Sequence, residues 1–245
     1  KRQGQVATRN YIGIVSTVNC SATVTKMIVE KIKYSNILND YPNIDGIVPI
    51  THSTGCGMNT VSEGMQMFQR TIDGFKNHPN FSHVFVIGLG CECAQVSLFD
   101  ESLKKHNRIH FLTIQDEGGT KKIVEKVLSQ IKNLLPEANK IKRTPQSVSH
   151  LTLALQCGGS DGYSGITANP ALGVAADLLV KKGGSSILSE TPEIYGAEHL
   201  LINRANSQET ADKLMERLKW WKNYTSINNS TCLLYTSDAA DEGHG

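Results

Sequence analysis

Short runs of β-branched and other apolar residues alternate with longer amphipathic stretches along most of the chain. This alternation is typical of βαβ units, in which helices connect the parallel strands of one sheet. The first series predicts strands over residues 11–18, 46–50, 83–88 and 109–114. Between and after them it predicts helices near residues 21–34, 60–75, 95–106 and 120–135. Serine is a common helix-capping residue, and we expect Ser21 to cap the first helix.

A second βα series follows a polar stretch, residues 136–149, whose Lys, Arg and Pro residues predict a linker. It contains predicted strands over residues 151–156 and 185–189, a helix from Pro170 to residue 182, and helices near residues 197–203 and 208–224. The predicted fold class is therefore α/β, with a Rossmann-like or flavodoxin-like parallel-sheet domain over residues 1–140. A second α/β domain, expected to be truncated, covers residues 141–229.

The last residues of the chain do not fit this pattern. From residue 230 the sequence reads STCLLYTSDAADEGHG, which neither continues the preceding helix nor shows a core pattern. It resembles translated adapter or vector sequence. We therefore interpret residues 230–245 as a non-native tail and do not consider Cys232 as a candidate site residue.

Composition narrows the classes of partner. Lys and Arg number 25 against 23 Asp and Glu, and this balance argues against nucleic acid or an anionic membrane as a partner. The apolar runs are strand-sized and too short to span a bilayer, and no signal-peptide pattern opens the chain. The cysteines are widely spaced and form no CxxC pair, which is unlike a disulfide scaffold. We therefore expect a cytoplasmic protein with reduced thiols.

Cysteines follow the carboxyl ends of several predicted strands, where open parallel sheets bind their ligands. Cys20 follows the first strand, Cys56 the second, Cys91 and Cys93 the third, and Cys157 the first strand of the second series. The competing interpretation is that each cysteine is a small buried hydrophobic residue. Their shared position in loops at one edge of a sheet favours a common site.

His52 lies in the same loop as Cys56, and we consider it as a metal ligand or a general base. Thiols together with an imidazole suit Fe(II), Mn(II) or Zn(II). Thiolates also suit an Fe–S cluster, and spacing does not separate these possibilities. We favour Cys91 over Cys93 as a ligand, because it directly follows a Gly-Leu-Gly string whose glycines permit close backbone approach.

The loop CGGSDGYSGITANP, residues 157–170, is rich in glycine and hydroxyl groups. Such a loop can present backbone N–H groups to an anion and hydroxyls to a polyol, and its candidate contacts are Ser160, Asp161 and Asn169. An elaborate turn would use the same residue types. Glu190 follows the next predicted strand and adds a carboxylate. No GxGxxG or P-loop motif occurs, so nucleotide-cofactor binding has no motif support.

A further resemblance is carried by the strings GQVATRNYIGI, STVNCSATV, THSTGCG, VIGLGCE, LALQCGGSDGYSGITANPALG and ETPEIYGAEHLL. They resemble the altronate/galactarate dehydratase family almost continuously from Gly4 to Asn228. The resemblance implies a three-part protein with a small SAF-type domain, a middle α/β domain and a larger C-terminal α/β domain. This sequence would hold the middle domain and the start of the last, and by itself it is expected to be inactive. The SAF-type partner would be fused upstream or carried by a separate subunit.

The activity implied by the resemblance is removal of water from a 2,3-dihydroxy sugar acid, which gives a 2-keto-3-deoxy acid. A base takes the proton next to the carboxylate, and a metal or hydrogen-bond donors stabilise the enediolate-like charge. Family members resemble Fe(II)- or Mn(II)-dependent enzymes, so Fe(II) is expected first, Mn(II) next and an Fe–S cluster least. Tyr163 and the GAEHLL string are closer to altronate-type than to galactarate-type sequences.

The resemblance also assigns roles to individual residues. The metal ligands or metal-proximal residues are expected to be His52, Cys56, Cys91 and Cys157. The residues expected to act in proton transfer are His52, Asp161 and Glu190. The residues expected to contact the substrate are Arg9, Asn10, Ser160 and Asn169. A guanidinium such as that of Arg9 suits bidentate pairing with a substrate carboxylate.

Two alternatives stay open. Some relatives resemble the large subunit of sulfolactate sulfo-lyase, which makes a C–S lyase the second candidate. A non-catalytic flavodoxin-like ligand-binding module is the third, and it predicts that His52, Cys56 and Cys91 lie apart or inside apolar walls. The sequence is compatible with a homo-oligomer.

Overall fold

The computed structural model describes residues 4–100, 108–156, 158 and 162–230. The chain divides into two compact units, Lys1–Thr144 and Pro145–Gly245. The division falls inside the predicted linker, residues 136–149.

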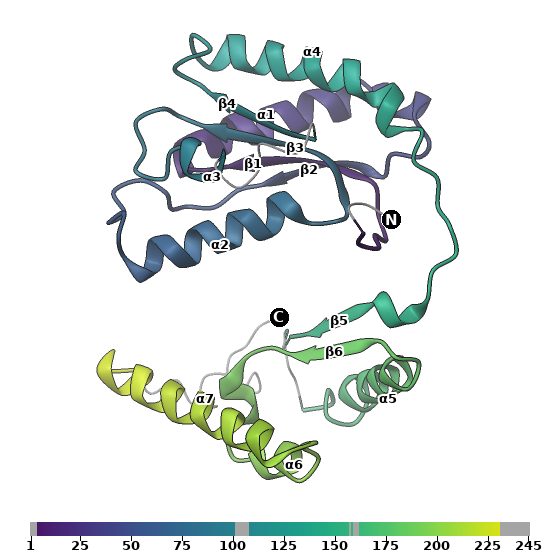
Figure 1. The fold of residues 1–245 in the computed structure, drawn as a ribbon, viewed down its shortest axis with the longest axis vertical. Helices are drawn as coiled ribbons and strands as arrows, with labels where there is room; N and C mark the ends of the chain where they lie inside the picture. Colours follow the sequence, from purple (N-terminus) through teal and green to yellow (C-terminus); the bar gives the residue numbers. More distant parts are fainter. Residues whose placement is uncertain (1–3, 101–107, 157, 159–161, 231–245) are drawn as a thin grey trace. The chain divides into compact units, whose positions relative to one another are not determined.

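The first unit is built on a parallel sheet of β1 (Tyr11–Ser16), β2 (Gly46–Ile50), β3 (Phe81–Gly88) and β4 (Ile109–Thr113). The strand order is β2-β1-β3-β4, and all three pairings are parallel. The long helices α1 (Asn19–Tyr34) and α4 (Thr120–Ala138) cover one face, and α2 (Glu63–Asn77) and the short α3 (Ser97–Asp100) cover the other (Figure 1). The predicted α/β class with a parallel sheet is confirmed.

The two faces of the sheet carry separate apolar clusters. Ile12 and Ile14 of β1 pack with α1 and α4, whereas Val15 packs with α2 and α3. On β3, Phe85 and Val86 likewise belong to opposite clusters. Since β1 and β3 are the central strands and are covered on both faces, they read as nearly continuous apolar runs.

The ends of the helices differ from the prediction in three places. Ser21 does not cap α1: the capping position is Val18, and the buried Ser21 hydroxyl donates to the carbonyl oxygens of Val18 (2.9 Å) and Ile87 (2.8 Å). The cap prediction is therefore wrong, and this serine fastens α1 to β3. Helix α2 begins after Ser62, whose hydroxyl accepts the Met65 N–H at 3.2 Å. Helix α4 continues past Pro136 to the fully buried Ala138.

The second unit pairs β5 (Thr152–Leu155) in parallel with β6 (Ser185–Leu188). Its helices are α5 (Ala168–Lys181), α6 (Glu198–Ile202) and α7 (Gln208–Ile227), with short 3₁₀ turns at Val148–His150 and Thr191–Ile194. Helix α5 has no buried residue, and Ala211 and Leu218 are the buried apolar residues of this unit among those described. The described part of this unit thus lacks a closed core, and a two-stranded sheet alone is marginally stable.

No helix in the described ranges has the length and apolar character needed to cross a membrane.

Candidate functional site

The loops after the first three strands of the sheet meet at its carboxyl edge. Asn19 N–H, after β1, donates to the carbonyl oxygen of Thr54, after β2, at 2.9 Å. Ala94 N–H, after β3, donates to the carbonyl oxygen of Gly55 at 3.4 Å. The loop after β4 joins them through Gln115 N–H, which donates to the Leu89 carbonyl at 3.0 Å. The sequence prediction that the strand-end loops share one edge therefore holds for these loops, and we call this edge the rim.

Gly55 brings the loop after β2 directly onto the end of β1. Its φ of +95° lies in the left-handed region, and a Cβ atom there would collide with the carbonyl oxygen of Thr17 and lie 2.9 Å from the Cα of Val18. Glycine is the residue type that tolerates both the conformation and the close approach. The position of the neighbouring Cys56 thus depends on this contact.

Glu92 holds the loop after β3 and is the rim residue that sequence reasoning missed. Its side chain is buried, and Oε1 accepts the Leu89 N–H and the Thr17 hydroxyl, each at 2.9 Å. Oε2 accepts the Gly90 N–H at 2.6 Å. A Cβ on Gly88 would lie 2.6 Å from Oε1, so glycine is needed there as well. The signal in the sequence was an acidic residue between two cysteines, two positions after the Gly-Leu-Gly string.

The cysteines of this rim are exposed. Cys20, Cys56, Cys91 and Cys93 are all free and exposed to solvent. The Cys20 thiol donates to Oδ1 of Asn19 at 3.3 Å. The alternative that these four residues are small buried hydrophobic residues is therefore wrong, because each presents its side chain at the surface.

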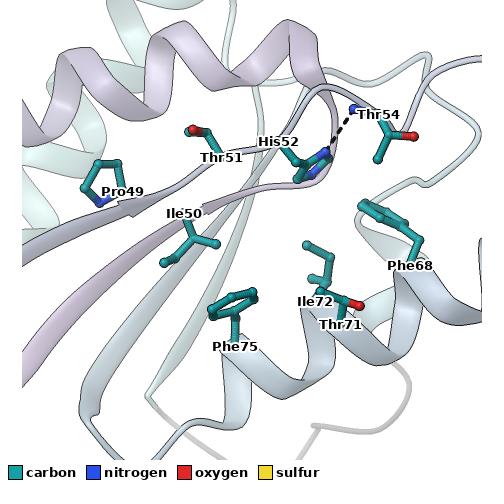
Figure 2. A pocket seen from close by; sticks show the side chains of 9 residues that line it. All are labelled: Pro49, Ile50, Thr51, His52, Thr54, Phe68, Thr71, Ile72 and Phe75. Carbon is teal, nitrogen blue, oxygen red and sulfur yellow. Dashed lines mark hydrogen bonds between the residues drawn. The ribbon is translucent and has the colours of Figure 1, made fainter. Parts of the chain in front are cut away.

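His52 is half-buried, and both of its ring nitrogens are engaged. Nδ1 accepts the Thr54 N–H at 3.2 Å (Figure 2), which assigns the hydrogen to Nε2. Nε2 donates to the Ser16 carbonyl oxygen at 2.9 Å. The ring meets Phe68 edge to face with 4.8 Å between centroids. His52 can act as a ligand or a base only after one of these hydrogen bonds breaks.

The imidazole lines a pocket of ≈ 430 Å³ between β2 and α2. Figure 2 shows its apolar walls and its few polar groups. The lining residues are Pro49, Ile50, Thr51, His52, Thr54, Phe68, Thr71, Ile72 and Phe75. None of them is a lysine or an arginine that could pair with a carboxylate. The apolar surroundings of His52 are those that the non-catalytic alternative predicts, whereas the exposed cysteines are not.

A metal centre is not assembled by the described residues. Among them, no group of three or more His, Cys, Asp or Glu side chains is arranged to hold an ion. The fourth predicted ligand, Cys157, lies outside the described residues, as do Ser160 and Asp161. The described part of the predicted ligand set does not by itself hold a metal, so the set stays a prediction.

Arg9 and Asn10 lie at the amino end of β1, at the opposite end of the strand from the rim. Asn10 is buried: its N–H donates to Oδ2 of Asp45 at 2.5 Å, and its Nδ2 donates to the carbonyl oxygens of Asn43 (2.6 Å) and Ala138 (3.1 Å). Arg9 is exposed. The arrangement gives Asn10 a fastening role at the start of the sheet, and it lends no support to the predicted substrate contacts.

In the second unit, Glu190 follows β6 at the carboxyl end of the strand pair, as predicted. It adopts a left-handed conformation with φ of 65°, and its Oε1 accepts a 3.5 Å hydrogen bond from the Gln156 amide after β5. Asn169 lies in the first turn of α5, where its N–H donates to the Ser164 carbonyl at 2.9 Å. A strained backbone at an acidic residue beside a strand end is a common feature of functional sites.

Two family models match the chain. The model for the second domain of D-galactarate dehydratase/altronate hydrolase matches residues 1–139. The model for the C-terminal domain of D-galactarate/altronate dehydratase matches residues 148–242. The second match runs into the segment interpreted as a non-native tail. That interpretation stays a prediction, because residues 231–245 also lie outside the described ranges.

Several curated proteins are similar to this chain over most of its length. Altronate dehydratase from Escherichia coli is 34% identical over 226 residues, which cover 91% of this chain and 44% of the relative. Galactarate dehydratase (L-threo-forming) from the same organism is 37% identical over 235 residues, covering 93% of this chain and 45% of the relative. Subunit beta of (2R)-sulfolactate sulfo-lyase from Chromohalobacter salexigens is more distant, at 23% over 210 residues, 86% of this chain and 50% of that subunit. The chain spans about half the length of the curated relatives it matches.

Proposed function

Because the chain belongs to the D-galactarate dehydratase/altronate hydrolase family, we propose that the protein removes water from a sugar acid. The family resemblance read from the sequence is thereby confirmed. The observation that carries the proposal is that both dehydratases are at least 34% identical over more than nine-tenths of this chain. Altronate is the first substrate to test and galactarate the second, because Tyr163 and the GAEHLL string are closer to altronate-type sequences.

The proposed reaction is an elimination. A base takes the proton on the carbon next to the carboxylate, hydroxide leaves the neighbouring carbon, and the resulting enol becomes a 2-keto-3-deoxy acid. The proton is weakly acidic, so donors near the carboxylate must stabilise the charge that develops there. At the rim, the N–H groups of Leu89 and Gly90 are occupied by Glu92, so this stabilisation must come from other donors.

Three residues are proposed for proton transfer: His52, Asp161 and Glu190. A basic lone pair on His52 is available only when Nδ1 releases the Thr54 N–H. Glu190 carries its carboxylate at a strand end, beside a neutral amide at 3.5 Å, and is the proposed base among the described residues. Asp161 lies outside the described ranges and is proposed on the resemblance alone.

The proposed cofactor is Fe(II), with Mn(II) in second place and an Fe–S cluster in third. This proposal rests on the resemblance and on the exposed thiols of the rim. A SAF-type domain as a partner and a homo-oligomeric assembly are proposed on the resemblance alone. The substrate contacts proposed for Ser160 and Asn169 have the same basis.

A C–S lyase is the second candidate, because a sulfo-lyase subunit is 23% identical over 86% of this chain. Such an enzyme would release sulfite where a dehydratase releases water. The dehydratases are clearly more similar, so we place the hydro-lyase first.

The test is a substrate panel of altronate, galactarate and sulfolactate, run on the full-length protein under reducing conditions with Fe(II), with Mn(II) and with a chelator. The proposal expects a 2-keto-3-deoxy acid from one of the sugar acids and no sulfite. Sulfite from sulfolactate, with no keto acid from either sugar acid, would favour the second candidate. The Glu190→Gln variant, compared with Glu193→Gln in the neighbouring turn, then tests the proposed base.

A further inference from the structure

Two exposed thiols flank the hydrogen bond that joins the loops after β2 and β3. Cys56 directly follows Gly55, whose carbonyl accepts the Ala94 N–H at 3.4 Å, and Cys93 directly precedes Ala94. Standard bond lengths on either side of this hydrogen bond keep the two cysteine Cα atoms within about 9 Å. A disulfide needs Cα atoms about 4.4–6.8 Å apart, so a small shift of either loop is sufficient.

Both loops are held against the same residue. The backbone of Gly55 lies against the carbonyl oxygen of Thr17, and the Thr17 hydroxyl donates to the buried Glu92 carboxylate at 2.9 Å. Glu92 in turn holds the N–H groups that precede Cys91 and Cys93. Loops anchored in this way keep two reactive groups close together and raise their effective concentration.

The other rim cysteines are less well placed to pair with Cys56. Cys91 is two residues further than Cys93 from the bond that joins the loops, with the buried Glu92 between them. Cys20 lies in the first turn of α1, beyond the separate Asn19–Thr54 hydrogen bond. The pair with the shortest connection through hydrogen-bonded backbone is therefore Cys56 and Cys93.

We propose that Cys56 and Cys93 form a dithiol site that hydrogen peroxide oxidises to a reversible disulfide. One thiolate attacks a peroxide oxygen, the O–O bond breaks, and a sulfenic acid and water result. The second thiol then attacks the sulfenic sulfur, the S–O bond breaks, and a second water leaves. Two thiols lose two electrons and two protons in total, and the peroxide takes up both.

This modification is independent of the proposed dehydration, since it requires neither substrate nor metal. Its consequence for the fold is a covalent link between the loops after β2 and β3. In the oxidised state these loops are tied together at the rim, and the Cys56 thiol is no longer available to any ligand.

The sequence makes the test simple, because trypsin places the candidate cysteines on separate peptides. Cys20 falls in residues 10–26, Cys56 in 34–70, and Cys91 with Cys93 in 77–104. The 245-residue chain is treated with hydrogen peroxide, free thiols are alkylated, and peptides are measured by mass spectrometry. We expect the 34–70/77–104 cross-link to exceed every other pair by at least about tenfold and to disappear after dithiothreitol.

Two matched variants identify the sulfur in the second peptide. The cross-link should persist in Cys91→Ser and be lost in Cys93→Ser, with Cys93→Ala as a second form of the latter variant. Chain unfolded in urea before oxidation should lose the preference. A cross-link that survives in Cys93→Ser, one that joins Cys56 mainly to the Cys20 peptide, or single oxidation of both thiols with no cross-link would each overturn the proposal.

Discussion

The hydroxyl of Thr17 donates a 2.9 Å hydrogen bond to Oε1 of Glu92, 75 positions away in the sequence. Thr17 follows β1 and Glu92 lies after β3, so the contact joins the ends of the two central strands of the sheet. The same carboxylate accepts the N–H groups of Leu89 and Gly90. One buried acidic side chain therefore gives the loop that carries Cys91 and Cys93 its shape.

Replacing Glu92 by Gln should lower the stability of the first unit. The side chain keeps its shape, but in either orientation its NH₂ group faces a backbone N–H, that of Gly90 or that of Leu89, which needs an acceptor. An unsatisfied buried donor costs about 1–3 kcal/mol. We expect the free energy of unfolding, measured with urea, to fall by about this amount.

The control for that experiment is Glu137→Gln, because the Glu137 side chain is 71% exposed and forms a surface ion pair with Lys140. Its effect should stay within about 0.5 kcal/mol. Equal unfolding midpoints for Glu92→Gln and the wild type would contradict the proposal that the Glu92 carboxylate holds the loop after β3.

Gly55→Ala should destabilise the fold much more than Gly57→Ala. Both glycines have positive φ, +95° at Gly55 and +67° at Gly57, but a Cβ at Gly57 meets nothing within 4 Å. Gly57→Ala therefore measures the conformational cost alone, about 1–2 kcal/mol. Gly55→Ala adds a collision with the backbone of Thr17, which cannot move aside as a flexible side chain can. Similar melting temperatures for the two variants would show that the loop is not packed on β1.

The stability of the protein should fall below about pH 6.5 in part through His110. Burial holds the pKa of His110 below its ordinary value, and its ring stacks on Phe85 with 4.5 Å between centroids, while His83 lies at 5.9 Å. As pH falls, the unfolded chain takes up this proton before the folded one does, so the free energy of unfolding decreases until the folded pKa is reached.

The His110→Phe variant keeps an aromatic ring beside Phe85 and removes this titration. Urea unfolding at several pH values should give a shallower loss of stability on acidification than in the wild type. If the two pH profiles run parallel, His110 does not contribute to acid sensitivity.

The first unit should fold by itself, and the second should not. Residues 1–144 carry both apolar clusters of the parallel sheet, including the fully buried Ile12, Phe85 and Ile131. In residues 145–245 the described buried apolar side chains are Ala211 and Leu218. Circular dichroism should show cooperative melting for the first fragment and a broad, weak transition for the second. A cooperative transition for the second fragment alone would contradict this expectation.

The strands could be predicted closely from the sequence because their signal is local. The β-branched runs that predicted 11–18 and 109–114 correspond to Tyr11–Ser16 and Ile109–Thr113. The cap at Ser21 failed because its hydroxyl finds a carbonyl 66 positions away, on β3. Helix α4 passes Pro136 because Leu135 and Ala138 beside it are fully buried. Tertiary contacts of this kind override a local preference.

Of the candidate site, only the meeting of the loops at one rim could be predicted from the sequence, because it follows from the topology of the sheet. Placing Cys20, Cys56 and Cys91 after successive strands was enough to bring their loops to one rim. The buried role of Glu92 depends on a partner on another strand, and the engagement of both His52 nitrogens depends on backbone geometry, neither of which a pattern of residue types contains.

Deuterium incorporation from the solvent distinguishes the proposed dehydration from the alternatives. When the reaction runs in D₂O, the enol must take one deuteron at carbon 3 as it becomes the ketone. We expect a 2-keto-3-deoxy acid from altronate or galactarate that carries one deuterium at that carbon, as measured by mass spectrometry and NMR. Unchanged sugar acids with every metal tested, or release of sulfite from sulfolactate instead, would contradict it.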